Sequence, residues 1–228
     1  MRRQLLPVVL LLVALLMVRQ IYPYVSGNEP NVVDGYEVER VATGLGGPTC
    51  LVWANETHLL ICDRDGGGIT ELNVETDARR VLLDGLDRPH GLVLLNNTAV
   101  VSEAGKLTSY TVDMNGMFIE GRVLVDGIPV GNHQTNTVDV MPNGTLLWHS
   151  GSTCNVCNEA DERNAALLWV NATTGEHGVL VSGVRNSFDG VWVDGHGYFF
   201  TDNGRDWEGD HPHEELNFMI PGAAYGWP

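Results

Sequence analysis

The sequence predicts an all-β protein of the β-propeller class, with about four blades in an open arc. Beyond residue 35, short apolar segments alternate with turns rich in Gly, Asn and Asp, and no helical spacing persists over three turns. A marker of glycine and an apolar residue recurs at Gly44-Leu45, Gly85-Leu86, Gly127-Ile128 and Gly183-Val184. The markers are 41, 42 and 56 residues apart. A four-stranded propeller blade takes about 40–45 residues, so each interval accommodates one blade.

The first repeat predicts four strands, at Thr49–Ala54, His58–Asp63, Gly68–Val74 and Arg79–Asp84. The last interval is longer because it contains an insertion, most of it at Ser152–Asn164. The fourth repeat shows strands only near Phe188–Val193, Gly197–Asp202 and Leu216–Ile220. We therefore expect an arc with open edges, which propellers normally avoid by closing. Either the sequence is a fragment, or other chain segments complete the ring.

The N-terminal segment has the pattern of an export signal. Arg2 and Arg3 precede an apolar run, Leu5–Val18, which is shorter than the roughly 20 residues that a membrane-spanning helix needs. No clear cleavage site follows it. Residues 1–26 are therefore predicted to be a signal peptide or an N-terminal membrane anchor, and residues 36–228 a partial propeller domain. The protein is expected to be secreted, or anchored on the outer side of a membrane.

The charge balance excludes one large class of partner. The chain has 13 Lys and Arg residues against 29 Asp and Glu residues, which gives a formal net charge of −16. Nucleic-acid binding depends on clustered basic residues, so we expect no nucleic acid. Acidic loops rich in carbonyl groups suit hard cations such as calcium.

Four cysteines in an exported chain favour disulfides. Cys154 and Cys157 form a C-x-x-C motif, and we predict that they bond to each other. Cys50 and Cys62 flank a predicted turn, where they could face each other across a hairpin. Free thiols and a zinc site remain alternatives, although zinc would prefer two C-x-x-C pairs.

Four sequons for N-glycosylation begin at Asn55, Asn96, Asn143 and Asn171. An exported chain could be modified at them. Turns rich in asparagine also produce such triplets by chance, so both interpretations stay open.

Several polar residues follow the repeat markers, where successive blades of a propeller approach the central channel. They are His90, His133, Arg185 and Asn186. A histidine and an arginine facing one channel could supply a general base and an anion clamp. Such a histidine is also often only a hydrogen-bonded turn residue. The run from Asp202 to Glu215 contains six carboxylates, which suits either a cation site or a solvated acidic loop.

Long segments resemble the glucose/sorbosone dehydrogenases that depend on pyrroloquinoline quinone (PQQ), and the sorbosone branch is the more similar one. The strings SGSTCNVCNEADERNA and NGRDWEGDHPHEELN, followed by YGWP, are the most specific. The resemblance covers about residues 40–228 and is strongest over residues 131–228. It implies a secreted six-bladed propeller that oxidises the anomeric or aldehyde carbon of sugars, with PQQ and calcium as cofactors.

The resemblance also implies roles for individual residues. His133 matches the catalytic base, and Arg185, paired with Asn186, matches the arginine that contacts PQQ. Gly204 and Arg205 match the turn whose carbonyls bind the calcium at PQQ, although the glucose branch has proline in place of Arg205. Two further positions, Glu215 and Tyr225, match ligands of a structural calcium in that branch.

The chain departs from the family pattern in three ways. Gln134 and Asn136 stand where the sorbosone pattern has arginines, the sequence stops at YGWP, and the later blades are absent. The expected function is oxidation of an aldose or a sorbosone-like aldehyde with hydride transfer to PQQ. An external electron acceptor then takes the electrons from the reduced cofactor. The resemblance implies that the later blades supply further PQQ contacts, so we do not expect these 228 residues to be active alone. The alternatives are a non-catalytic extracellular binding propeller and a calcium-dependent lactonase-type propeller.

Overall fold

The computed structural model describes residues 32–206 and 213–228, and within them the chain forms fifteen strands and no helix. The chain divides into two compact units, residues 1–43 and 44–228, and all the strands belong to the second. The predicted signal, residues 1–26, lies outside the described residues. No helix in the described part of the chain could span a membrane.

The strands form four antiparallel sheets in chain order. The first contains β1 (Pro48–Trp53), β2 (His58–Asp63), β3 (Gly68–Asn73) and β4 (Arg79–Leu83). The second contains β5 (Gly91–Leu95), β6 (Thr98–Glu103), β7 (Lys106–Val112) and β8 (Phe118–Val125). The third contains β9 (Thr135–Val140), β10 (Leu146–Ser150), β11 (Ala166–Val170) and β12 (His177–Ser182). The described part of the fourth contains β13 (Gly190–Val193), β14 (Gly197–Asp202) and β15 (Glu215–Phe218).

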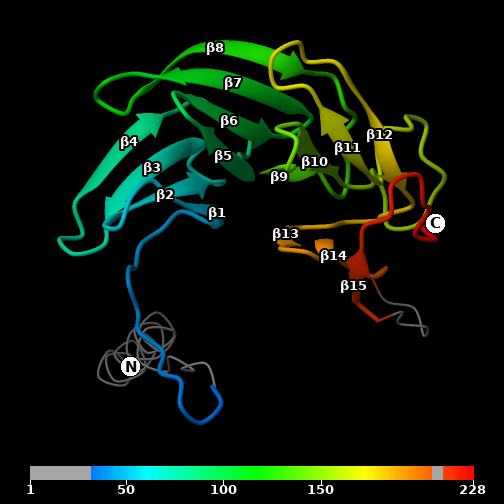
Figure 1. Cartoon of the computed structure of the whole chain (residues 1–228), viewed down its shortest axis with the longest axis horizontal. Helices are drawn as coiled ribbons and strands as arrows, with labels where there is room; N and C mark the ends of the chain where they lie inside the picture. The colour runs from blue at the N-terminus through cyan, green and yellow to red at the C-terminus, as the bar shows by residue number, and fades with distance from the viewer. Residues whose placement is uncertain (1–31, 207–212) are drawn as a thin grey trace, which may run out of the picture. The chain divides into compact units, whose positions relative to one another are not determined.

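Each sheet is one propeller blade, and the four blades follow one another around an arc (Figure 1). Within each blade the strands pair only with their neighbours in sequence, which is the meander of a propeller blade. The first strand of each blade lies on the inner side of the arc. The prediction of an all-β, four-blade propeller is therefore confirmed.

The marker glycines make the turn that leads into each blade. Gly44, Gly85, Gly127 and Gly183 all have a left-handed backbone, with φ of 68°, 74°, 69° and 68°. This conformation costs glycine little, because it has no Cβ. In three cases the amide of the following apolar residue donates to a carbonyl just before the third strand of the blade that the chain is leaving. These bonds join Leu86 to Gly67, Ile128 to Gly105 and Val184 to Ala165, at 2.9, 3.2 and 2.9 Å.

The alternation of strands gives the arc two faces. We call one the linker face: it contains the connections between blades and the loops between the second and third strands of each blade. The other, the hairpin face, contains the turns between first and second strands and between third and fourth strands. All four sequon asparagines lie on the hairpin face, in the turns β1–β2, β5–β6, β9–β10 and β11–β12.

The core consists of apolar side chains packed between neighbouring blades. Trp148 of β10 is fully buried, and its indole N–H donates to the hydroxyl of Ser102 in β6 at 2.8 Å. His149, also fully buried, joins the third blade to the fourth. Its Nδ1 lies 2.8 Å from the Ser187 hydroxyl and its Nε2 lies 2.9 Å from the Tyr198 hydroxyl. These contacts fix the fourth blade, and with it the loops of the candidate site.

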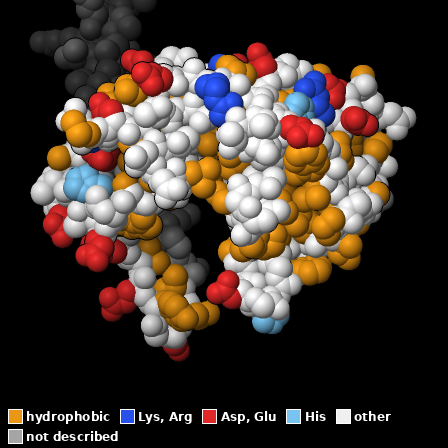
Figure 2. All heavy atoms as spheres, turned by 45° about the horizontal axis from the view of Figure 1, so that its top comes forward, with side chains coloured by type: hydrophobic (Ala, Val, Ile, Leu, Met, Phe, Trp, Pro, Cys, Tyr) orange, Lys and Arg blue, Asp and Glu red, His pale blue; other side chains and the backbone are white. Residues whose placement is uncertain are grey.

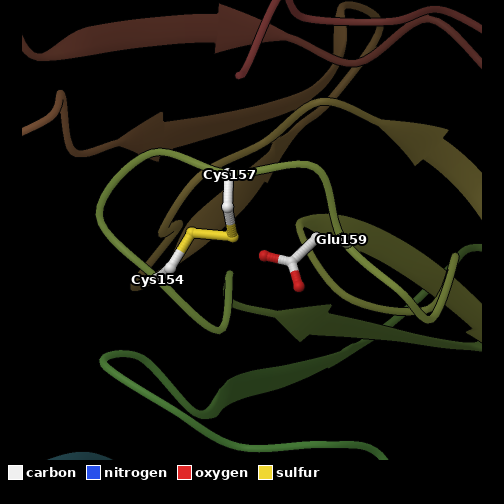
Figure 3. Close-up of side chains that lie close together, drawn as sticks. All are labelled: Cys154, Cys157 and Glu159. Atoms are coloured by element: carbon white, nitrogen blue, oxygen red, sulfur yellow. A yellow bond between two sulfur atoms is a disulfide. The ribbon is translucent and has the colours of Figure 1, made fainter.

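All four cysteines form disulfides, so the zinc and free-thiol alternatives are wrong. Cys50 and Cys62 are direct partners across β1 and β2, with Cα atoms 5.0 Å apart. Cys154 and Cys157 bond to each other as predicted, with Cα atoms 6.1 Å apart. Figure 3 shows the Glu159 carboxylate directed toward this second bond, which leaves no thiolate there for a metal.

The two end sheets of the arc expose large apolar side chains. Leu51 and Trp53 of β1 are 62% and 58% exposed, and Leu216 of β15 is 74% exposed. Figure 2 shows hydrophobic side chains exposed at several places on the face that it presents. Among the described residues no further sheet covers these surfaces.

Candidate functional site

A cavity of about 350 Å³ opens on the linker face beside the fourth blade. It brings together five of the seven residues predicted for the site. These are Arg185, Gly204, Arg205, Glu215 and Tyr225. The other two, His133 and Asn186, do not line the cavity. They lie close to each other, because a Cβ on Gly151 would be 2.7 Å from the Cβ of His133 and 3.3 Å from Oδ1 of Asn186. Five predicted residues thus line one cavity, and the other two belong to blade linkers on the same face.

Local structure explains why distant residues converge here. Arg185 follows the marker Gly183-Val184, in the linker that leads into β13. Gly204 and Arg205 belong to the connection from β14 to β15, and Glu215 is the first residue of β15. Blade linkers and the loops between second and third strands share the linker face, so the fold places all of them at one end of the fourth blade.

The guanidinium of Arg185 is held by three residues from two neighbouring segments, the insertion and the connection from β14 to β15. Its Nε donates to the Asn155 carbonyl at 3.1 Å, and its Nη2 donates to Oδ1 of Asn155 at 2.8 Å. Its Nη1 donates to the Asn203 carbonyl at 3.2 Å. Nη2 also meets a carboxylate oxygen of Asp206 at 2.8 Å. Arg185 is only 3% exposed, whereas the Asp206 side chain is 69% exposed. A buried arginine therefore presents a cationic edge to an exposed carboxylate at the cavity.

Asp202 fixes the backbone of the Arg185-Asn186 pair. Its two carboxylate oxygens accept the amide protons of Arg185 at 2.9 Å and Asn186 at 2.7 Å. Burial is the main cause that raises the pKa of Asp202 to about 6, and the negative charge of Glu215, its cross-strand partner, contributes to this rise against the two amide hydrogen bonds. The amide oxygen of Asn186 accepts a bond from Asn136 at 2.9 Å, so this oxygen is engaged within the protein.

His133 lies in the linker before β9 and is partly buried. Its Nδ1 is 2.8 Å from the hydroxyl oxygen of Ser152. Burial lowers the pKa of His133, and the nearby cation of Arg185 lowers it further. The imidazole is therefore neutral over a wider pH range than an exposed histidine, which suits a proton acceptor.

The predicted calcium ligands lie in the same cavity. Some of their polar atoms are already engaged in hydrogen bonds within the protein. The Gly204 amide donates to a carboxylate oxygen of Glu214 at 2.8 Å. Glu215 accepts a bond from the side chain of Asn217 at 3.0 Å. The Tyr225 hydroxyl donates to the Phe218 carbonyl and accepts from the Ile220 amide, so only the main-chain carbonyl of Tyr225 remains as a metal ligand. Carboxylate and carbonyl oxygens are the ligands that calcium takes.

Sequence reasoning missed three residues of this site: Ser152, Asn155 and Asp206. Ser152 contacts His133, and the other two contact Arg185. The signal was present, because Ser152 and Asn155 belong to the insertion around the C-x-x-C motif. That segment was interpreted as a disulfide loop and not as part of the site.

The two arginine-to-amide departures have a structural explanation. Asn136 donates to the Asn186 side chain and to the Ser187 carbonyl at 2.7 Å, within the core between the third and fourth blades. Gln134 donates to the Arg88 carbonyl at 2.9 Å. Both amides therefore connect segments of this protein to one another.

Comparisons with known proteins identify the fold. A family model described as TrAA12-like matches residues 30–223. The structure of a Trichoderma reesei carbohydrate-active enzyme of family AA12 has a TM-score of 0.76 and 22% identity, over 87% of this chain and 60% of its own. A PQQ-bound aldose sugar dehydrogenase from Streptomyces coelicolor has a TM-score of 0.70 and 23% identity, over 84% of this chain and 65% of its own.

A soluble aldose sugar dehydrogenase from Escherichia coli, in the apo form, has a TM-score of 0.63 and 16% identity, over 81% of this chain and 63% of its own. At these identities the likeness shows the fold. The chain spans about three fifths of the length of these structures. A comparison with curated protein sequences gives no match.

Proposed function

Because the chain belongs to the TrAA12-like family, we propose that it acts as a quinoprotein that oxidises a sugar, an aldose or a sorbosone-like aldehyde. The observation that supports this most is the convergence of Arg185, Gly204, Arg205, Glu215 and Tyr225 on one cavity. His133 is close enough to Arg185 to sense its charge. Similarity to a PQQ-bound aldose sugar dehydrogenase supports the same cofactor. An external electron acceptor and an extracytoplasmic location belong to the proposal, and two disulfides are consistent with that location.

The residues of the cavity fit PQQ and calcium. PQQ has carboxylates, and the contact between Arg185 and Asp206 shows that a carboxylate already fits against this guanidinium. The exposed carboxylate of Asp206 stands in for the one that the cofactor would present. The carbonyls of Gly204 and Arg205, together with the oxygens of Glu215 and Tyr225, would hold calcium. When bound, PQQ supplies the acceptor for the hydride of the sugar.

In this proposal His133 accepts the proton of the substrate hydroxyl. Its lowered pKa keeps it neutral, and therefore basic, at moderately acidic pH. Asp202 holds the backbone of Arg185, and Asn155 orients its guanidinium, so that the positive charge is aligned before any ligand binds. The deprotonating residue and the anion-binding residue come from neighbouring blades, on the same face.

Cofactor binding gives the first test. The purified chain is titrated with PQQ, with and without calcium, and binding is followed by isothermal calorimetry. We expect saturable binding that needs calcium and that weakens at least tenfold in Arg185→Ala, because a charge-assisted fork is lost. Arg64→Ala, which removes an exposed ion pair with Asp65, is the matched control and should bind like the parent. No saturable binding under either condition would overturn the proposal that the residues of this cavity hold PQQ.

Turnover gives the second test. Protein loaded with PQQ and calcium is assayed with a dye acceptor on a panel of aldoses and sorbosone. His133→Ala should lower kcat by roughly 10²–10⁴-fold while PQQ binding persists. His196→Ala is the control, since this histidine lies in the exposed β13–β14 turn on the hairpin face. Activity of His133→Ala within about threefold of the parent would overturn the role of this residue.

A further inference from the structure

The segment of His133 is paired with the loop that contains Ser152. The His133 amide donates to the Ser152 carbonyl at 3.2 Å, and the Gly151 amide donates to the Gln134 carbonyl at 3.0 Å. On the far side, the Ser152 amide donates to the Arg185 carbonyl at 2.8 Å. Ser152 is fully buried between the two linkers. Its side chain is therefore held in one place relative to the imidazole.

The hydroxyl of Ser152 has two polar neighbours, and its single proton can serve only one of them. Its oxygen lies 2.8 Å from Nδ1 of His133 and 2.8 Å from the Cys154 carbonyl oxygen. A carbonyl oxygen only accepts, whereas a neutral imidazole nitrogen either donates or accepts. Both contacts are hydrogen bonds only if Ser152 donates to the carbonyl and Nδ1 of His133 donates to Ser152.

We propose that Ser152 is a positioning residue that selects the tautomer of His133 with the proton on Nδ1, which leaves the lone pair on Nε2. The Cys154 carbonyl decides the direction of the chain Nδ1–H to Oγ–H to O=C. Cys154 in turn belongs to the ring closed by the Cys154–Cys157 disulfide, which fixes where that carbonyl points. The insertion in the third blade thus sets the protonation pattern of a histidine in the linker before β9.

This inference deepens the proposed function and rests on it for its catalytic meaning, whereas the tautomer itself is a property of the chain. A general base needs a nitrogen with an available lone pair directed at its substrate. If Nδ1 accepted from Ser152 instead, the proton would be on Nε2 and that nitrogen could not act as a base. The hydrogen-bond partner that selects the tautomer is a neutral hydroxyl and not a carboxylate. It therefore does not stabilise the charged imidazolium form, and the imidazole stays neutral more readily.

Three charged groups surround His133 and bear on its titration. Arg185 belongs to the linker before β13, and its positive charge disfavours the imidazolium form of His133. Asp206, from the connection between β14 and β15, and Glu159, from the insertion, favour it. Burial and Arg185 outweigh the two carboxylates, so the neutral form that carries the tautomer persists.

Nitrogen NMR of histidine tests the tautomer without cofactor, substrate or turnover. The full chain is labelled with ¹⁵N in its eight histidines, and His133→Gln identifies the signals of His133 by their loss. Couplings to the ring protons distinguish a protonated Nδ1 from a protonated Nε2 in the neutral ring. Spectra are recorded across a pH titration for the parent, Ser152→Ala, Ser152→Thr and Ser150→Ala.

We expect the parent to hold the Nδ1–H tautomer as its main neutral form. Ser152→Ala should shift the ratio of the tautomers toward Nε2–H by about fivefold to tenfold, the effect of one net hydrogen bond. Ser152→Thr keeps a hydroxyl and should retain the parent ratio. Ser150→Ala is the matched control, because Ser150 is a buried serine two residues away whose hydroxyl has no hydrogen-bond partner.

Two outcomes would overturn the inference. One is a parent whose neutral His133 carries its proton on Nε2. The other is an unchanged ratio in Ser152→Ala. If Ser152→Ala fails to fold, the spectrum of the parent still decides the first point. Failure of PQQ binding or of dye reduction, with the tautomer as expected, would count against the proposed function and not against the hydrogen-bond chain.

Discussion

Arg185 and Asn155 are joined by two hydrogen bonds, one to the main-chain carbonyl and one to the side-chain oxygen of the asparagine, at 3.1 and 2.8 Å. Asn155 lies within the ring that the Cys154–Cys157 disulfide closes. The indole N–H of Trp227, in the wall of the cavity, donates to the same carbonyl at 3.3 Å. The insertion of the third blade is therefore part of the site of the fourth.

This relationship predicts different effects for the two disulfides. The double variant Cys154→Ser/Cys157→Ser should weaken PQQ binding by about fivefold to tenfold, because Asn155 loses its fixed position and Arg185 loses net hydrogen bonding. Its effect on the free energy of unfolding should be smaller than that of removing the Cys50–Cys62 bond, because the ring closed by residues three apart is short.

The matched control is Cys50→Ser/Cys62→Ser, which removes a bond between residues twelve apart in the first blade. It should lower the free energy of unfolding by about 2–3 kcal/mol and leave PQQ affinity unchanged. Urea unfolding and PQQ titration measure the two quantities. Equal PQQ affinity in both double variants would contradict the link between the ring and Arg185.

Replacing Arg185 by lysine should destabilise the protein although the charge is kept. An ammonium group cannot match the geometry of the carbonyl, amide and carboxylate oxygens that surround the guanidinium. We expect a loss of about 1–3 kcal/mol in urea unfolding, because buried oxygens lose their donors. Arg64→Lys, at an exposed ion pair, should change stability by less than about 0.5 kcal/mol. A similar loss of stability in both variants would show that the hydrogen bonds of the Arg185 guanidinium do not stabilise the fold.

Gly151→Ala should displace His133. The added methyl would lie 2.7 Å from the Cβ of His133 and 2.8 Å from the Gln134 carbonyl oxygen, so the two segments must separate. We expect about 1–3 kcal/mol of destabilisation from overpacking, together with a changed His133 spectrum. Gly144→Ala is an informative comparison, since no atom lies near its Cβ and its cost comes from the left-handed backbone alone. It should leave the His133 signals in place.

Asp139 should make the protein less stable at neutral pH than at mildly acidic pH. Burial, with a smaller contribution from the charge of Asp189, raises the pKa of Asp139 from the ordinary 3.8 to about 6. The folded state therefore binds a proton more readily than the unfolded state. The destabilisation by the ionised Asp139 carboxylate is fully present above about pH 6. It disappears as the pH falls toward the pKa of this group in the unfolded state, about 4.

Asp139→Asn removes this penalty and keeps an oxygen that can accept from Tyr198. In urea unfolding the variant should be more stable than the parent by about 1–3 kcal/mol near pH 7–8, with the difference vanishing near pH 4. Asp113→Asn should show the opposite sign, because the Met117 amide lowers the pKa of the Asp113 carboxyl and thereby stabilises the fold above its unfolded pKa. A pH-independent difference for Asp139→Asn would contradict the assignment.

The fold was largely predictable because its repeat is local. Each marker glycine needs a left-handed turn at the same point of a blade, and this requirement is visible in the sequence as Gly44, Gly85, Gly127 and Gly183. Strand bounds in the first blade agree within one residue, as at His58–Asp63. In the fourth blade the prediction starts two residues early at Phe188, because apolar character there reflects contact with His90 and not strand pairing.

The candidate site was predictable where its residues belong to recognisable motifs. His133, Arg185 and Glu215 were found from their resemblance to known motifs, and the structure brings them to one face. Ser152 and Asn155 act through a hydroxyl and an amide whose partners come from other loops, so the local sequence marks their insertion by its C-x-x-C motif but does not indicate these contacts. The hydrogen bond of Trp227 to the Asn155 carbonyl joins residues 72 positions apart, a separation that no local pattern predicts.

The two faces of the arc also decide how the protein can be attached to a solid support. Asn55, Asn96 and Asn143 are exposed at the tips of corresponding hairpins in three successive blades, all on the face away from the cavity. A chemical tether at any of them would orient the molecule with the cavity toward solution, where the proposed sugar substrate and a soluble dye would both have access. A tether near Arg205 would turn the cavity toward the support and would shorten the path to an electrode from the cofactor that we propose for this cavity.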